Sequence, residues 1–83
     1  MNLTLKYFAS IRETMGCASE QRQTQAADVA ALRDELIAQG GLHAQALARD
    51  KLVRVAVNQV MVSESGALTD GAEVAFFPPV TGG

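Results

Sequence analysis

The chain has 83 residues, of which 48% are hydrophobic and 19% are charged, and its net charge is -2. This length allows one small domain with a compact core, and no apolar run reaches the roughly 20 residues of a membrane span. A slightly acidic chain without a Lys/Arg cluster argues against nucleic-acid binding. The N-terminus lacks the basic and apolar segments of a secretory signal. With a single cysteine and no internal disulfide to form, we expect a cytoplasmic protein.

The first predicted element is a half-buried strand over residues 3–8, where apolar and polar side chains alternate. Residues 9–16 end at Gly16 and favour a short helical turn. Residues 18–25 are polar and have no clear apolar face. Their position suits a second strand at the edge of a sheet.

Two helices are expected in the middle of the chain. Asp28 is a suitable N-cap, and apolar residues follow at helical spacing: Val29, Leu32 and Leu36. Gly40-Gly41 ends this main helix. Residues 42–49 predict a shorter second helix.

The C-terminal half predicts three strands, over residues 52–58, 60–62 and 73–77. Asn58-Gln59 and Asp70-Gly71 have the composition of turns between them. Pro78 and Pro79 end the last strand, because proline has no N–H to donate to a sheet.

This order of elements predicts an α+β domain over residues 1–77, with an extended tail over residues 78–83. One main helix and a short second helix would cover one face of a mixed sheet, and the β-grasp arrangement fits that order and length. The alternative is a ferredoxin-like split βαβ fold. That fold would need a second full-length helix between the later strands.

The tail is the most informative segment. It reads Pro78-Pro79-Val80-Thr81-Gly82-Gly83. Prolines hold a backbone extended, and the five residues past Pro78 reach about 17 Å at about 3.4 Å each. Glycines permit close approach of another backbone, so this tail can thread into a narrow channel of a partner and present the carboxylate of Gly83. That carboxylate reacts only after activation, for instance by attack on the α-phosphate of ATP. A frayed or truncated end is the alternative.

Three sequence segments resemble a known family. The run from Asp70 to Gly83, which contains Phe76-Phe77-Pro78-Pro79-Val80-Thr81-Gly82-Gly83, resembles the C-terminus of the small subunit of molybdopterin synthase. The segments Tyr7-Phe8-Ala9-Ser10-Ile11-Arg12-Glu13 and Ala56-Val57-Asn58-Gln59 extend the resemblance over the whole chain at matching spacing.

The resemblance implies a ubiquitin-like β-grasp fold and a sulfur carrier that is not catalytic alone. An adenylyltransferase related to ubiquitin-activating enzymes would use ATP to adenylate Gly83. A cysteine desulfurase or a rhodanese would then supply sulfur and give a thiocarboxylate. That sulfur would pass to cyclic pyranopterin monophosphate in the large synthase subunit, within a heterotetramer. The resemblance implies no permanently bound cofactor and no metal.

Strand alternation predicts which side chains face the helices. The helix-facing set is Leu3, Leu5, Val55, Val57, Val74 and Phe76. Phe8, Met61 and Phe77 have the opposite parity, so they would form an exposed apolar patch that needs a partner. The alternative is a minor second core under a loop.

Charged and nucleophilic residues give weaker predictions. Arg12 and Lys6 either steer an acidic partner surface or a phosphate, or are ordinary surface charges. Cys17 lacks an activating neighbour, and His43 lacks a ligand cluster for a metal. Three consecutive charged residues are expected on the solvated face of the main helix: Arg33, Asp34 and Glu35.

Other functions remain open at this point. A sulfur carrier of thiamine type shares Gly82-Gly83, but that family is usually shorter and lacks the Phe-Phe-Pro-Pro run. A ubiquitin-like modifier would form isopeptide bonds through Gly83. A plain interaction module would carry the tail by accident.

Overall fold

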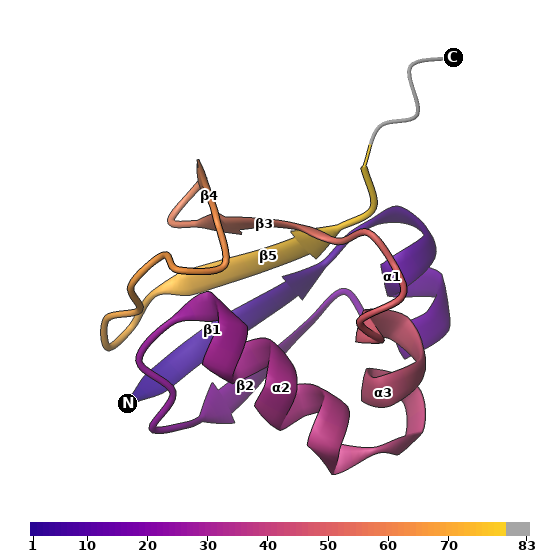
Figure 1. Ribbon diagram of the computed structural model, residues 1–83, viewed down its shortest axis with the longest axis horizontal. Helices are drawn as coiled ribbons and strands as arrows, with labels where there is room; N and C mark the ends of the chain where they lie inside the picture. The colour runs from indigo at the N-terminus through magenta and orange to yellow at the C-terminus, as the bar shows by residue number, and fades with distance from the viewer. Residues whose placement is uncertain (80–83) are drawn as a thin grey trace.

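The structure is a computed structural model that describes residues 1–79. Five strands and three helices follow one another along the chain (Figure 1). In chain order they are β1 (Asn2–Tyr7), α1 (Ala9–Met15), β2 (Ser19–Gln23), α2 (Val29–Gln39), α3 (Gly41–Leu47), β3 (Arg54–Val57), β4 (Val60–Val62) and β5 (Glu73–Phe77).

The strands form one mixed sheet in the order β2-β1-β5-β3-β4. The central strands β1 and β5 run parallel, and the other neighbours are antiparallel. Helices α2 and α3 lie on one side of this sheet, and no helix formed by residues 1–79 covers the other side (Figure 1). The α+β prediction and the β-grasp arrangement are therefore confirmed. The ferredoxin-like alternative is wrong, because no helix lies between β3 and β5.

The helix count corrects the prediction of one main helix and one short helix. Residues Ala9–Met15 form a full helix, α1, rather than a turn, and bury Ile11 and Met15 against the core. Gly16 ends α1 in the left-handed conformation at φ 76°, which glycine adopts without a steric cost. At the start of α2, Asp28 Oδ1 accepts a hydrogen bond from the Ala31 amide at 2.8 Å, so the predicted N-cap is confirmed.

Two turns tie the strands together. Asn58 and Gln59 both have positive φ, 50° and 69°, which is the backbone that joins a tight two-residue hairpin with the correct twist. The Asn58 side chain also accepts a hydrogen bond from the Glu73 amide at 3.0 Å. At the other turn, Asp70 Oδ1 accepts one from the Asn2 amide at 2.6 Å.

The core lies between the sheet and the helices. Five of the six predicted helix-facing residues are buried: Leu3, Leu5, Val55, Val74 and Phe76. The sixth, Val57, is half-buried against this core. Tyr7 completes the layer, and its ring stacks on Phe76 with ring centroids 6.1 Å apart.

The prediction of a solvated Arg33 is wrong, since only 4% of this residue is exposed. Its guanidinium donates to three backbone carbonyls at 2.8–2.9 Å, those of Leu47, Ala48 and Lys51. It also pairs with Glu64 at 3.0 Å. The arginine therefore binds the end of α3 and the segment after it. Asp34, by contrast, is exposed as predicted.

Candidate partner-docking face

The uncovered face of the sheet is built from residues that alternate with the core residues. Paired residues on neighbouring strands point to the same face, so the register fixes the layout. Ala75 of β5 pairs with Lys6 of β1 and with Ala56 of β3, and Ala56 pairs in turn with Met61 of β4. The small side chains of Ala56 and Ala75 form the apolar centre of this face, here called the apolar floor, and larger side chains surround it.

Two phenylalanines meet at one end of the floor. Phe8, 46% exposed, follows the last residue of β1, and Phe77 is the half-buried last residue of β5. Their rings lie edge to face, with centroids 6.3 Å apart, an arrangement that aromatic pairs favour. Met61 is 49% exposed on the same face. The predicted placement of these three residues is confirmed, and their role in partner binding stays a prediction.

The tail leaves the domain beside this aromatic pair. Pro78 and Pro79 directly follow Phe77 and are half-buried. The amide of Phe8 donates to the Phe76 carbonyl at 3.1 Å, so the start of α1 is bonded to the end of β5. The predicted residues Val80, Thr81, Gly82 and Gly83 lie outside the described residues, as does most of the predicted tail segment 78–83.

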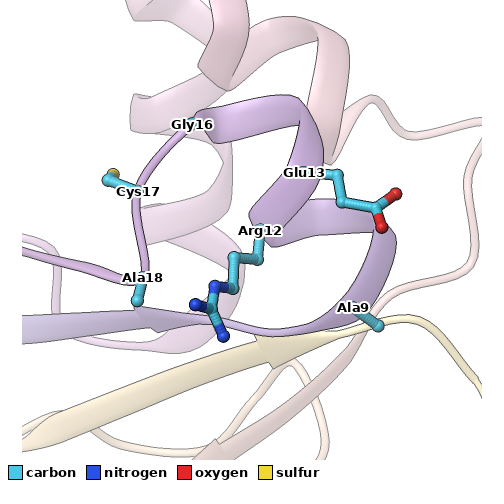
Figure 2. Close-up of a pocket in the computed structure, with 6 residues that line it drawn as sticks. All are labelled: Ala9, Arg12, Glu13, Gly16, Cys17 and Ala18. Carbon is cyan, nitrogen blue, oxygen red and sulfur yellow. The ribbon is translucent and has the colours of Figure 1, made fainter.

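Arg12 lies on α1 and lines a shallow hollow of about 630 Å³ (Figure 2). Its side chain extends from the helix toward β1, whereas Glu13 points the other way. The other lining residues are Ala9, Gly16, Cys17 and Ala18. Within residues 1–79, no three His, Cys, Asp or Glu side chains gather as a metal site, and no helix is long and apolar enough to span a membrane.

The other titratable residues singled out in the sequence have structural surroundings. Lys6 lies 3.9 Å from Glu73, and Cys17 is half-buried against the core. His43 Nε2 lies 2.8 Å from a carboxylate oxygen of Glu20 and thereby links α3 to β2. None of the three belongs to the apolar floor or the aromatic pair.

Tyr7 is a polar side chain in the core layer. This side chain is inside the core, and its hydroxyl has no hydrogen-bond partner among residues 1–79. Burial, and secondarily the nearby carboxylate of Glu20, raise the pKa of Tyr7 far above its usual value. Tyr7 therefore stays neutral inside the core and takes no part in the docking face.

Comparison with known proteins agrees with the β-grasp fold. The model of the ThiS family matches residues 5–83. The chain belongs to the ThiS family. A relative in Escherichia coli K12, the molybdopterin synthase sulfur carrier subunit, is 48% identical over 77 residues, which cover 93% of this chain and 94% of the relative.

Solved structures resemble this ThiS-family chain over its full length. SAMP1 from Haloferax volcanii is 26% identical with a TM-score of 0.77, and the match covers 100% of both chains. A chain of the complex of subunits 1 and 2 of the molybdopterin-converting factor from Helicobacter pylori is 23% identical with a TM-score of 0.68, again over 100% of both chains. The second likeness shows the shared fold.

Proposed function

We propose that this chain is the sulfur carrier subunit of molybdopterin synthase. The observation that carries the proposal is the uncovered apolar face, on which Phe8 and Phe77 meet where Pro78 begins the tail. A partner that covers this face receives the tail at the same time. The sulfur-carrier name of the 48% identical relative supports the choice of chemistry.

In the proposed reaction, the carboxylate of Gly83 attacks the α-phosphate of ATP, and pyrophosphate leaves. The persulfide sulfur of the donor then attacks the acyl carbon and AMP leaves. A second thiol cleaves the resulting acyl disulfide, which releases the thiocarboxylate and leaves a disulfide between that thiol and the donor. The thiocarboxylate is anionic with a soft nucleophilic sulfur, and it attacks cyclic pyranopterin monophosphate on the way to the dithiolene. The apolar floor and the aromatic pair carry no titratable group, so the acids and bases for these steps belong to the partners.

The proposed partners are the large subunit of molybdopterin synthase, an adenylyltransferase of the ubiquitin-activating type, and a cysteine desulfurase or rhodanese. The Helicobacter pylori neighbour, solved together with its subunit 2, supports the first partner. The cytoplasm is the compartment that this chemistry implies. ATP is consumed by the adenylyltransferase, and no permanently bound cofactor is proposed for this chain.

Intact mass spectrometry tests the carrier chemistry. The chain is incubated with ATP, the adenylyltransferase and the sulfur donor, and we expect one oxygen to be replaced by one sulfur. Deleting Gly83 should abolish the exchange and leave the thermal unfolding midpoint nearly unchanged, because chain ends contribute little to a core. Gln25→Ala, an exposed change near the N-terminus, is the control that should load normally. Sulfur loading that persists without Gly83 would contradict the mechanism.

A second measurement separates the pathways. The loaded chain is mixed with the large subunit and the pterin precursor, and we expect the sulfur to leave Gly83 while the dithiolene forms. Loading without transfer would assign the chain to another sulfur pathway. Isopeptide-linked products that end at Gly83 would instead identify a protein modifier.

A further inference from the structure

The cationic side chains divide into two groups. The chain has seven Lys and Arg residues, all of which lie within residues 1–79. Five of them form ion pairs or hydrogen bonds with other parts of the chain: Lys6, Arg22, Arg33, Arg49 and Lys51. The remaining two, Arg12 and Arg54, have no carboxylate within 4.0 Å and no side-chain hydrogen bond in the part of the chain that the structure describes.

Each of these two arginines is a neighbour of one member of the aromatic pair. Arg54 is the strand partner of Phe77, so its exposed side chain extends from the docking face next to that ring. Arg12 is exposed one helical turn after Phe8, and its amide donates to the Phe8 carbonyl at 3.3 Å. The carboxylate nearest to Arg12 in sequence, Glu13, points away from it (Figure 2).

We propose that Arg54, together with Arg12, recognises carboxylates on the protein surface that accepts the tail. This inference rests on the proposed function and adds the charge that the partner must present: acidic side chains beside a pocket for Phe8 and Phe77. A guanidinium binds a carboxylate through two parallel hydrogen bonds. Neither arginine has a carboxylate partner among residues 1–79, so binding an acidic partner breaks no ion pair within the described domain.

The net charge of the chain makes the position of these arginines important. At -2, the chain as a whole repels an acidic partner weakly. Arg54 on the docking face and Arg12 on α1, neither paired within residues 1–79, add positive charge near the aromatic pair. Charges at the rim of an interface act mainly on the association rate and on orientation, and salt screens them. The two arginines are therefore expected to govern how fast and in which orientation the face docks.

The test measures association with the purified large subunit of molybdopterin synthase by stopped-flow fluorescence. At about 0.02 M NaCl, Arg54→Gln should slow association roughly 5-fold, and the difference should disappear at about 0.5 M NaCl. Arg54→Lys keeps the charge and should restore most of the rate. The double variant Arg12→Gln/Arg54→Gln should be slowed further.

Gln25→Glu is the matched control. It changes the net charge by one unit in the same direction as Arg54→Gln, but it lies beside the N-terminus, at the opposite end of β1 from Phe8. It should leave the association rate nearly unchanged. All single variants should unfold at the same urea concentration as the unaltered chain, because exposed side chains contribute little to stability.

Three results would overturn the inference. The first is an association rate of Arg54→Gln at low salt that equals the rate of the unaltered chain. The second is a slowing of association by Gln25→Glu as large as the slowing by Arg54→Gln. A salt-sensitive self-association that Arg54→Gln abolishes, without any binding to the large subunit, would assign the face to a second copy. Binding that is independent of Arg54 removes this inference and leaves the proposed function standing, whereas failure of the unaltered chain to bind removes both.

Discussion

Phe76 and Phe77 are neighbours in β5, yet they lie on opposite faces of the sheet. Phe76 is fully buried among the core side chains under the helices, and Phe77 remains half-buried beside Phe8 on the face that no helix covers. The two residues have the same hydrophobicity, so strand parity alone decides which of them stabilises the domain. The helix-covered face, here called the inner face, supplies folding free energy. The uncovered face, here called the outer face, keeps apolar area available for a partner.

Replacing Phe76 tests the inner face and should have the largest effect. Phe76→Ala removes a buried aromatic ring that stacks on Tyr7 and leaves a cavity, so we expect a loss of about 4 kcal/mol in the free energy of unfolding. Urea denaturation followed by circular dichroism measures this loss. A loss below about 1 kcal/mol would mean that the inner face is not the main source of stability.

The buried charge on the helix-covered side gives the next largest effect. Arg33→Met keeps most of the side-chain length but removes the donors to Leu47, Ala48 and Lys51. We expect the free energy of unfolding to fall by about 3 kcal/mol, since buried carbonyl oxygens lose their partners. Arg54→Met is the control at an exposed arginine and should cost less than about 0.5 kcal/mol. Equal effects of the two substitutions would contradict the structural role of Arg33.

Replacing Phe77 tests the outer face. Phe77→Ala should weaken binding to the large synthase subunit about 30-fold, or about 2 kcal/mol, because aromatic residues at the centre of an interface carry much of the binding energy. Isothermal titration calorimetry measures the affinity. The stability of the free domain should fall by only about 1 kcal/mol, since the ring is half-exposed. Loss of stability equal to that of Phe76→Ala, with unchanged affinity, would place Phe77 in a second core.

Much of this two-faced sheet could be predicted from the sequence because its signals are local. Alternation along each strand identifies the inner face without any knowledge of strand order. The Asp28 cap and the Asn58-Gln59 turn depend on residues a few positions apart, and the structure confirms both. Val57 is less buried than its parity predicts, because it lies in β3, whose outer neighbour is the edge strand β4.

Arg33 and Arg54 show what a single sequence does not contain. Both are arginines that flank apolar positions, yet Arg33 is buried, whereas Arg54 is exposed and has no ion-pair partner among residues 1–79. The carbonyls that bind Arg33 belong to α3 and to the segment after it, 14 to 18 residues away. Whether an arginine binds a carboxylate or a carbonyl depends on how distant elements pack. The environments of Arg33 and Arg54 therefore cannot be predicted from the spacing of residues in the sequence.

The smallest predicted effect concerns pH and is confined to the helix-covered side. Burial alone would raise the pKa of Glu35, but hydrogen bonds from Thr24 and Arg22 outweigh it and hold the pKa below its ordinary value of 4.5. A hydrogen bond from Arg49 likewise lowers the pKa of Glu64. A carboxyl group with a lowered folded-state pKa contributes stability above its unfolded-state pKa. This contribution is lost as the pH falls through the folded-state value.

We therefore expect the free energy of unfolding to decrease as the pH falls below about 4.5. Glu35→Gln should lower stability at about pH 7 by less than about 1 kcal/mol, since the carboxylate is partly screened by solvent, and should make the acid-induced decrease shallower. Urea denaturation at a series of pH values measures both effects. Arg54→Gln, which removes an unpaired cation from the opposite face, should leave the shape of the curve unchanged. An unchanged curve for Glu35→Gln would show that the hydrogen bonds of this carboxylate to Thr24 and Arg22 do not contribute to stability.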